Sequence, residues 1–284
     1  MKKINNADIR KYTTYKLEGK VKAIYFPSDV LELKELISDF KDKKIRYKVI
    51  GNGSNLIISP NYDGVLIKLE KFDKLNIDGN IVKVGSGYML SKLALECAHN
   101  GLSGLEFAST IPATVGGAIY QNAGAYGFSI DNIIKEVSVL DDNNEIITLY
   151  KEDLDFGYRD SIFKHKKFIC LEVTLELKEG NSEDILKKLK ENLESRKEKQ
   201  PLEYPSAGSV FRNPLGYSAG KLIEDTGLKG YRVGDAMVSY KHANFIVNMG
   251  HATSEDVLKL IKLIQDKVKE KTGILLETEQ EFIE

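Results

Sequence analysis

The sequence predicts an α+β protein of two or three domains, and three observations support this prediction. The chain has 284 residues, which is enough to bury more than one core. Residues 21–70 alternate strand-like and helix-like runs, as in a small α/β unit. Residues 75–180 favour short strands, and residues 200–284 form a third region that mixes strands with helices. Segregated blocks of this kind are typical of α+β architecture.

Periodicity and flanking residues place the elements of the first two regions. In the first, Ser28 is the expected N-cap of an amphipathic helix at 28–44. In the second, a helix is expected at 89–99 and should end at Gly101. The expected strands of both regions are 21–27, 45–50, 56–59, 64–69, 81–88, 133–140, 145–150 and 168–177.

A charged helix is expected to connect these regions to the third. It should begin at Ser182 as its cap and end before Pro201. Beyond it we expect a short strand around 209–211, helices near 218–225 and 254–271, and a final strand over 274–283. In such a strand the carboxylates of Glu277, Glu279 and Glu281 share one face, a pattern that solvation alone also explains.

Composition excludes several classes of protein. The 41 basic and 42 acidic residues leave a net charge of −1, which argues against a dedicated nucleic-acid binder. Cys97 and Cys170 are too few for a disulfide framework and indicate a reducing compartment. The first residues contain no apolar run typical of a signal peptide, and no stretch approaches the ~18 apolar residues of a membrane span. We therefore expect a soluble cytoplasmic protein that contacts no membrane, and the scattered histidines predict no metal site.

The most informative segment is GLEFASTIPATVGGAIYQNAGAYG at residues 104–127. It contains five glycines, five alanines and one charged residue, Glu106. Glycine and alanine let main-chain amides approach a flat or phosphorylated ligand closely. The polar side chains of Thr114, Gln121, Asn122 and Tyr126 would then orient that ligand. A close-packed turn between core elements is the alternative interpretation.

A second glycine-containing turn, GNGSN at 51–55, follows a predicted strand. Its successive amides can wrap an anion such as a pyrophosphate, although a simple hairpin turn explains the same residues. A Rossmann site is excluded, because Leu56 stands at the third glycine position and the following residues continue as strand where a helix would be needed.

Three further motifs carry polar groups suited to catalysis or binding. Arg159 in YRDS can clamp a carboxylate, although a surface pair with Asp160 is the simpler explanation. Ser209 in SAGSVFRN can deliver a proton, and it can equally be a turn serine. His242 suits either a polar group at a site or a structural cap.

Taken together, these motifs resemble the bacterial flavoenzyme family of UDP-N-acetylenolpyruvoylglucosamine reductases. Seven blocks match the family in order along nearly the whole chain. They are TTYKLEG, GNGSNLIIS, the segment 104–127, YRDSIF, KQPLEYPSAGSVFRNP, AGKLIEDTGLKGYRVGDAMVSYKHANFIVN and LETEQEFI. The form of the YRDS and KQPLEYPSAGS blocks is similar to the shorter type of this enzyme, which lacks a tyrosine-bearing lid loop.

The resemblance implies a two-part FAD-binding domain of the vanillyl-alcohol-oxidase type and a C-terminal α/β substrate-binding domain. The expected boundaries are 1–68 and 69–195 for the two FAD-binding subdomains and 196–284 for the substrate domain. FAD would be held without a covalent bond. The residues carried over as FAD contacts are Gly51, Asn52, Gly53, Ser54, Asn55, Leu56, Thr110, Ile111, Pro112, Ala113, Thr114, Gly116, Gly117, Asn122, Gly124, Ala125 and Tyr126.

The resemblance also implies a reaction. The family uses NADPH and FAD to reduce UDP-N-acetylglucosamine enolpyruvate to UDP-N-acetylmuramate, in peptidoglycan precursor synthesis. Arg159, Ser209 and Glu279 match its three catalytic positions, with Ser209 as proton donor. Substrate contacts would come from Tyr158, Lys199, Asn213 and His242. The oligomeric state is left open, with a monomer as our expectation.

Two departures from the family pattern bear on these expectations. Thr110 and Ala113 stand where the family usually has glycines, and alanine resists a positive φ, so we expect an effect on the turn or on FAD affinity. LETEQEFI has Gln280 and Glu281 where valine and arginine are more usual after the glutamate, which leaves Glu279 in place and should mainly affect its neighbours. Two other functions stay open from the sequence. One is a flavin oxidase of the same fold, for which no histidine tether is evident, and the other is a non-catalytic nucleotide-sugar or flavin-binding protein.

Overall fold

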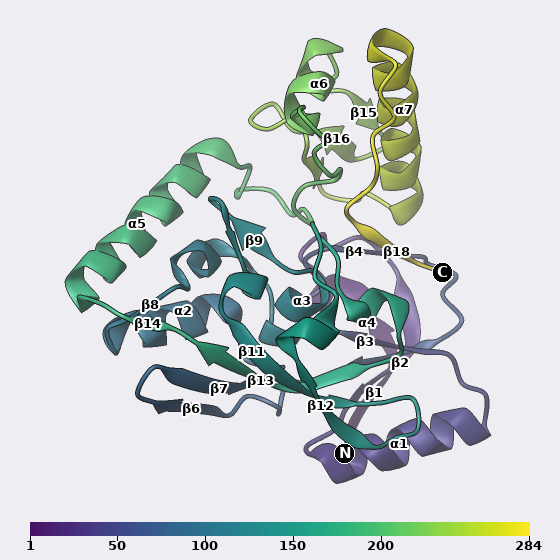
Figure 1. Ribbon diagram of the computed structural model, residues 1–284. Helices are drawn as coiled ribbons and strands as arrows, with labels where there is room; N and C mark the ends of the chain where they lie inside the picture. Colours follow the sequence, from purple (N-terminus) through teal and green to yellow (C-terminus); the bar gives the residue numbers. More distant parts are fainter. The chain divides into compact units, whose positions relative to one another are not determined.

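The computed structural model describes all 284 residues, which divide into two compact units. Unit 1 contains residues Met1–Ile4, Ala23–Asn52 and Gly64–Ser195, and unit 2 contains Asn5–Lys22, Gly53–Asp63 and Arg196–Glu284. The chain therefore enters each unit more than once (Figure 1). The expected division into three domains at residues 68 and 195 stays a prediction.

A four-stranded sheet and one helix come first along the chain and belong largely to unit 1. The four-stranded sheet has the order β1 (Lys2–Asp8), β2 (Lys20–Phe26), β5 (Val65–Lys68), β3 (Tyr47–Ile50), and β5 pairs in parallel with β2 and β3. Helix α1 (Val30–Asp42) packs Leu33, Ile37 and Phe40 into the core beside this sheet. Its N-cap is Asp29, whose carboxylate accepts from the Glu32 amide at 2.9 Å. The prediction of Ser28 as N-cap was wrong by one residue.

An antiparallel sheet forms the second part of unit 1. Its strand order is β12 (Ile146–Tyr150), β11 (Ile134–Leu140), β13 (Ile169–Glu176), β7 (Ile81–Gly85), β6 (Leu75–Asp78). Helix α2 (Leu90–His99) buries Leu93, Ala94 and Cys97 in the same core and ends before Gly101, as predicted. Cys97 and Cys170 are buried free thiols, and burial raises the pKa of Cys97 to about 12.

Short elements complete unit 1. Strands β8 (Leu102–Ser103) and β14 (Lys178–Glu179) pair with each other, as do β9 (Gly124–Ala125) and β10 (Phe128–Ser129). The short helices are α3 (Val115–Tyr120) and α4 (Ile162–His165), and the 3-10 turns of this unit are Glu106–Thr110, Ile130–Asn132 and Lys151–Leu154.

Helix α5 (Ser182–Lys199) does more than connect two regions. Asn181, and not the predicted Ser182, caps it by accepting from the Asp184 amide at 3.1 Å. The Ser182 hydroxyl instead donates to the Ala98 carbonyl at 2.7 Å. Further along, the buried Asn192 donates to the Glu106 carbonyl at 2.8 Å. The helix is thus fixed to α2 and to the start of the glycine-rich segment.

Helices and a small sheet form the core of unit 2. The antiparallel sheet has the order β15 (Arg232–Val233), β16 (Ala236–Val238), β17 (Ile246–Asn248), and α7 (Ser254–Thr272) packs beside it with α6 (Ala219–Asp225), as Figure 1 shows. Thr253 caps α7 in a capping box with Asp256, and Gly273 ends it at φ 75°. These ends agree with the prediction for 254–271.

The C-terminal segment differs from its prediction. Only β18 (Glu281–Ile283) is strand, and it pairs in parallel with β4 (Leu56–Ile58). Residues 274–280 make isolated contacts, so Glu277, Glu279 and Glu281 do not share one strand face. The strand expected at 209–211 is likewise reduced to single bridges at Ser209 and Phe211. Each of these two segments bonds to the other at only a few points, which is too few for a continuous ladder.

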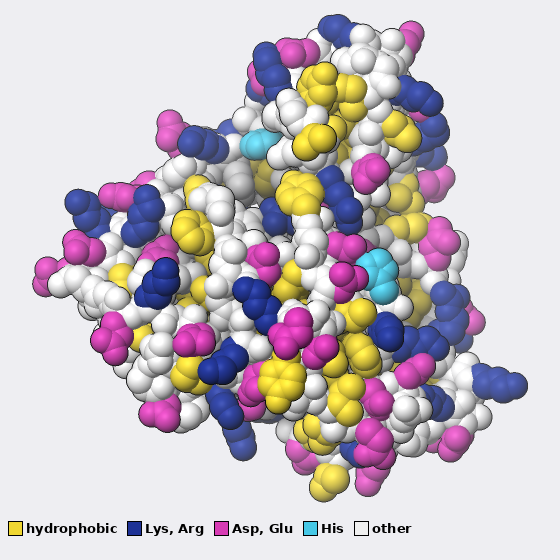
Figure 2. Space-filling model, in the orientation of Figure 1, with side chains coloured by type: hydrophobic (Ala, Val, Ile, Leu, Met, Phe, Trp, Pro, Cys, Tyr) yellow, Lys and Arg dark blue, Asp and Glu magenta, His cyan; other side chains and the backbone are white.

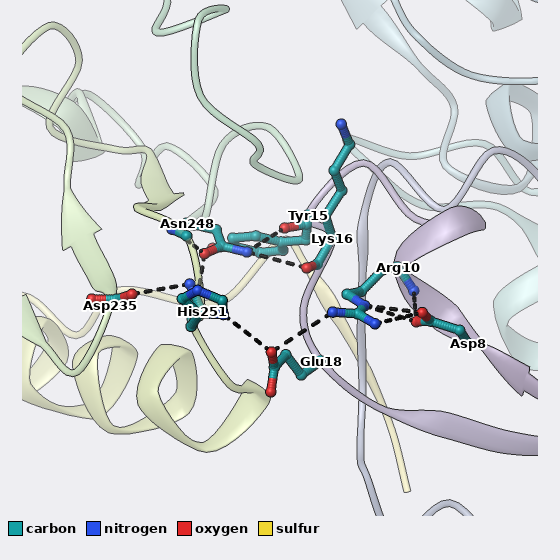
Figure 3. Close-up of polar contacts among 10 residues, drawn as sticks. Asp8, Arg10, Tyr15, Lys16, Glu18, Asp235, Asn248 and His251 are labelled. Carbon is teal, nitrogen blue, oxygen red and sulfur yellow. Dashed lines mark hydrogen bonds and ion pairs between the residues drawn. The ribbon is translucent and has the colours of Figure 1, made fainter.

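A buried amide fixes an N-terminal segment within unit 2. Asn248 is 3% exposed, and its Nδ2 donates to the carbonyls of Tyr15 and Lys16 at 3.1 and 3.2 Å (Figure 3). Its Oδ1 accepts from the amides of Gly250 and Ala252 at 2.9 and 3.0 Å. Every polar atom of this side chain is therefore used.

The surface mixes charges of both signs. Figure 2 shows Lys and Arg side chains interspersed with Asp and Glu over the visible face, in keeping with the net charge of −1. No helix is long and apolar enough to span a membrane. No group of three His, Cys, Asp or Glu side chains is arranged to hold a metal ion.

Candidate active site

The predicted site residues divide between the two units. Unit 1 holds Gly51, Asn52, Thr110, Ile111, Pro112, Ala113, Thr114, Gly116, Gly117, Asn122, Gly124, Ala125, Tyr126, Tyr158 and Arg159. Unit 2 holds Gly53, Ser54, Asn55, Leu56, Lys199, Ser209, Asn213, His242 and Glu279.

In unit 1 the glycine-rich segment contacts Gly51 and Asn52, the first two residues of the GNGSN turn. Asn52 Nδ2 donates to the Pro112 carbonyl at 2.7 Å. A Cβ atom placed on Gly51 would collide with the Thr114 hydroxyl oxygen, so only glycine allows this approach. Thr114 caps α3 by accepting from the Gly117 amide at 3.3 Å. Two segments about 60 residues apart in sequence, predicted separately from their glycines, therefore form one surface.

Lys68 is a charged residue at this surface that the sequence motifs did not reveal. Its side chain is only 8% exposed, and Nζ donates to the Gly51 carbonyl at 2.9 Å. Desolvation lowers the pKa of Lys68, and Glu70 at 3.7 Å opposes that shift. A buried lysine is rare enough to signal a function, but the apolar strand VLIK gives no local hint of it.

Thr110 and Ala113 do not strain the glycine-rich segment. Neither is among the residues with positive φ. The Ala113 amide donates to Ile111 at 2.9 Å, and the Ala113 carbonyl accepts from the Leu90 amide at 2.9 Å. The backbone of this chain therefore accommodates both residues without a left-handed conformation. The expected effect on the turn or on FAD affinity stays a prediction.

Three left-handed residues of unit 1 belong to the predicted site. Asn122, Tyr126 and Arg159 have φ values of 41°, 55° and 58°, in the left-handed region that non-glycine residues rarely adopt. Tyr126 is half exposed, and its hydroxyl donates to the Asn192 carbonyl at 3.0 Å. The hydroxyl predicted to face FAD is thus engaged with α5.

The Arg159 side chain lies against the glycine-rich segment. Its Nη2 donates to the Gly124 carbonyl at 2.8 Å and its Nη1 to the Asn122 carbonyl at 3.5 Å. Lys164 Nζ donates to the Arg159 carbonyl at 2.7 Å, and the Tyr158 ring lies 5.4 Å from the guanidinium. The cation is held in a defined position, which a carboxylate clamp requires.

Two buried side chains brace the turn that carries Arg159. Asn122 is 5% exposed, donates Nδ2 to the Gly157 carbonyl at 3.0 Å and accepts the Asp131 amide at 3.2 Å. Ser161 is fully buried and donates to the Tyr120 carbonyl at 2.7 Å. The Asn122 side chain thus supports the Arg159 turn, a role that the sequence prediction did not assign to it.

In unit 2, the TTYKLEG block contacts both the GNGSN turn and the serine loop, which we define as residues 206–210. Gly53 has φ 65°, and a Cβ there would collide with the Tyr12 carbonyl. The Thr14 amide donates to the Gly53 carbonyl at 3.2 Å. The Thr14 hydroxyl donates to the Ser206 carbonyl at 2.7 Å. The TTYKLEG block therefore fixes the backbone of the GNGSN turn at Gly53 and that of the serine loop at Ser206.

Ser209 and Glu279 come together in unit 2. The Glu279 amide donates to the Val210 carbonyl at 2.8 Å, one residue from Ser209. Asn55 Nδ2 donates to the Glu279 carbonyl at 3.0 Å. The Val210 amide in turn donates to the Asn244 carbonyl at 2.9 Å. Backbone hydrogen bonds therefore join the segments that carry two of the three predicted catalytic residues.

The remaining predicted substrate contacts have structural partners. Asn213 is exposed, and its Oδ1 accepts from the Ala219 amide at 3.0 Å, at the start of α6. His242 Nδ1 accepts from the Asn244 amide at 3.2 Å, and burial together with nearby Lys229 lowers the pKa of His242. Lys199 is exposed at the end of α5. These bonds place Asn213 and His242 but leave a binding role untested.

The residues of unit 1 fit a flavin nucleotide. Both side-chain amide atoms of Gln121 and the hydroxyl of Ser86 are buried without a protein partner, so they can bond to polar groups of a ligand. Gly116 lies against Ser86, where a Cβ would approach within 2.9 Å. Lys68 adds a positive charge beside Gly51. Polar atoms, close backbone and a cation are the groups that a dinucleotide with a pyrophosphate needs.

Known proteins match this chain over nearly its whole length. Residues 200–283 match the family model of the C-terminal domain of UDP-N-acetylenolpyruvoylglucosamine reductase, and residues 21–150 match that of an FAD-binding domain. The reductase of that name from Caldicellulosiruptor bescii is 48% identical over 97% of this chain and 88% of its own. The one from Clostridium tetani is 43% identical over 96% of this chain and 90% of its own.

Solved structures support the same assignment. The crystal structure of UDP-N-acetylenolpyruvylglucosamine reductase from Thermus caldophilus has a TM-score of 0.85 and 37% identity, and the match covers 100% of this chain and 98% of that one. A BBE-like protein from Physcomitrella patens has a TM-score of 0.50 and 16% identity over 63% of this chain and 42% of its own, which indicates a shared fold alone. The α+β prediction, with its FAD-binding part and separate C-terminal domain, is confirmed. The chain belongs to the UDP-N-acetylenolpyruvoylglucosamine reductase family of FAD-dependent oxidoreductases.

Proposed function

We propose that this protein uses NADPH to reduce UDP-N-acetylglucosamine enolpyruvate to UDP-N-acetylmuramate, a step of peptidoglycan precursor synthesis. The observation that supports this proposal is the hydrogen bond from the Glu279 amide to the Val210 carbonyl, which joins the backbone that carries Glu279 to the residue after Ser209 in a family member. When bound, FAD supplies the hydride that it has received from NADPH. The residues of this chain then have to bind the substrate and move one proton.

Arg159 would bind the substrate carboxylate. Reduction of the enol ether places negative charge next to that carboxylate, and a fixed cation stabilises such charge better than a mobile one. The hydrogen bond from Arg159 Nη2 to the Gly124 carbonyl at 2.8 Å and the braced turn supply that fixity. Tyr158, 57% exposed beside the guanidinium, is a proposed contact for the nucleotide sugar.

Ser209 would donate the proton, and Glu279 would polarise the same end of the substrate. A serine hydroxyl is a weak acid, so it needs a strongly basic carbon and a close approach. The half-buried Ser209 follows Gly208, whose φ of 75° turns the chain at that point. Glu279 would act through its protonated form or a water molecule, because two bare carboxylates repel.

Binding of FAD would rest on the two glycine segments. The proposed contacts are residues 51, 52, 110–114, 116, 117, 122 and 124–126 in unit 1, with Lys68 as an addition, and residues 53–56 in unit 2. Asn213, His242 and Lys199 stay proposed contacts of the nucleotide sugar. We also propose a cytoplasmic monomer, which sedimentation of the holoprotein would test.

An assay of the purified holoprotein tests the function. Anaerobically, a yellow protein should oxidise more than one equivalent of NADPH per flavin only when the enolpyruvyl sugar nucleotide is added, and mass spectrometry should show the product with two added hydrogens. Rapid oxygen consumption with a small alcohol or sugar would indicate a flavin oxidase instead. Binding of the sugar nucleotide without NADPH oxidation would indicate a binding protein. Either outcome would overturn the proposal.

A further inference from the structure

Gln280 lies between a proposed catalytic residue and the strand β18. Its side chain is 6% exposed. Nε2 donates to the carbonyls of Ala207 and Gly208 at 3.1 and 3.2 Å, the two carbonyls that immediately precede Ser209. One amide group thus clamps two successive peptide units of the serine loop.

The two hydrogen bonds from Gln280 act at Gly208, where the backbone conformation sets the direction of the Ser209 side chain. Gly208 has φ 75°, so a small rotation there would swing the following side chain. Beyond Ser209 the chain is already fixed, because Val210 bonds to Asn244 on one side and to Glu279 on the other at 2.9 and 2.8 Å. Before Gly208, the Gln280 amide supplies the matching restraint.

The environment of Gln280 makes this restraint stiff. Tyr15 lies beside its side chain and is fully buried. The backbone on both sides of Gln280 is also paired, since the Glu279 carbonyl accepts from Asn55 at 3.0 Å and the Glu281 amide donates to Asn55 at 2.9 Å. Because the backbone around Gln280 is fixed, its side chain loses little conformational freedom when it bonds to the serine loop.

We infer that Gln280 is a positioning residue for proton transfer: its amide holds the turn at Gly208 so that the Ser209 hydroxyl is kept at the reacting carbon. This inference rests on the proposed role of Ser209. Misplacement of a reacting group by about 1 Å can cost about 100-fold in rate. Loss of the clamp should therefore slow the proton-dependent step and leave reduction of the flavin by NADPH unchanged.

The test compares Gln280→Met with Gln265→Met in anaerobic stopped-flow experiments on the holoprotein. Gln265 lies on α7 and donates Nε2 to the Leu276 carbonyl of the C-terminal segment at 2.9 Å, so it also holds that segment but makes no bond to the serine loop. For Gln280→Met we expect flavin reduction by NADPH within about twofold of wild type and reoxidation by the enolpyruvyl substrate slower by about 10- to 100-fold. Gln265→Met should change neither rate by more than about twofold. Equal losses in both half-reactions of Gln280→Met would show a structural role only, and wild-type reoxidation would also overturn the inference.

A double mutant separates positioning from a general loss of packing. If Gln280 acts through the Ser209 hydroxyl, Gln280→Met should slow reoxidation by less than about twofold in a Ser209→Ala background. A full additional loss in that background would overturn the inference. Failure of the proposed function would appear separately, because Ser209→Ala alone would then leave reoxidation unchanged.

Gln280→Glu keeps the test decisive if the methionine variant does not fold. The introduced carboxylate would repel the Ala207 and Gly208 carbonyls, whereas its protonated form can donate one hydrogen bond. We expect reoxidation by substrate to be slow at pH 8 and to recover, relative to wild type, as the pH falls. A rate ratio that does not change with pH would contradict the inference.

Discussion

The two units hold their proposed catalytic side chains in different ways. In unit 1, Arg159 lies in a turn with φ 58°, beside Asn122 at φ 41°. In unit 2, Ser209 follows a glycine turn and begins a segment of paired backbone, supported by the buried amides of Asn244 and Gln280. In unit 1, strain of about 1–2 kcal/mol at each of these left-handed residues therefore accompanies the bracing by the Asn122 side chain, whereas unit 2 relies on buried amides that take the place of strand neighbours.

This difference predicts how alanine and glycine substitutions should change the stability of each unit. Where the backbone is left-handed, a glycine should relieve strain even as it removes a side chain. Where an amide pairs with buried backbone, glycine and alanine should be equally harmful, because both leave the backbone groups unpaired. Measuring the stability of alanine and glycine variants in both units tests this difference.

The largest effect on stability is expected for Asn244→Ala in unit 2. Asn244 is 4% exposed and exchanges two hydrogen bonds with the Phe211 backbone, at 2.9 and 2.8 Å. Its removal leaves a buried N–H and a buried carbonyl unpaired and should cost about 3–5 kcal/mol. Urea unfolding of the holoprotein measures this, with the exposed Asn61→Ala as a control expected to cost under about 0.5 kcal/mol. A cost below about 1 kcal/mol at Asn244 would contradict the account of unit 2.

Asn122 should give the next largest effect and the sharpest comparison. Asn122→Ala loses two hydrogen bonds and leaves an alanine in the left-handed region, so we expect a cost of about 2–4 kcal/mol. Asn122→Gly should be less harmful by about 1 kcal/mol, because glycine adopts that conformation freely. At Asn244, which has no positive φ, glycine should not be better than alanine. Equal losses of unfolding free energy in Asn122→Ala and Asn122→Gly would show that the backbone at Asn122 is not strained.

Arg159 should show the same strain with a smaller effect on stability. Arg159→Ala and Arg159→Gly both remove the guanidinium and should both abolish most substrate reduction. Calorimetry should nevertheless find the glycine variant more stable by about 1 kcal/mol, because φ at this position is 58°. A less stable glycine variant would show that the turn relaxes once the guanidinium is removed.

The smallest effect is a pH dependence due to His242. Burial lowers its pKa in the folded state below the 6.5 of an exposed histidine, and its Nδ1 accepts from the Asn244 amide only when it is unprotonated. As pH falls below about 6.5, the unfolded chain takes up the proton first, so unfolding becomes easier. The Tm of wild type relative to His242→Gln should therefore fall between pH 7 and pH 5. A constant difference would contradict the pKa shift.

Local patterns predicted the helices and the glycine-rich segment well. Gly101 and Gly273 end helices because each adopts a positive φ that a helix terminus uses. Two caps were misplaced by one residue, since Ser28 and Ser182 each adjoin an equally good cap, Asp29 or Asn181. Which neighbour accepts the helix amide depends on local geometry that the sequence pattern does not contain.

The side-chain contacts that position the site residues were harder to predict than the motifs that contain those residues. Lys68, Asn122 and Gln280 act through partners that lie 17, 35 and 72 or 73 residues away in the sequence. No local period marks such contacts, because they depend on which segments the fold brings together. The single bridges at Ser209 and Phe211 also replaced a predicted strand, since the apolar alternation does not tell whether a partner continues alongside.

The most direct test of the central claim is the reactivity of Ser209→Ala in the two half-reactions. With Ser206→Ala as the matched control from the same loop, anaerobic stopped-flow absorbance should show flavin reduction by NADPH within about twofold of wild type in both variants. Reoxidation by the enolpyruvyl sugar nucleotide should slow by about 10²- to 10⁴-fold in Ser209→Ala alone, because only that variant lacks the proton donor. Unchanged reoxidation in Ser209→Ala, or an equal loss in both half-reactions, would contradict the claim.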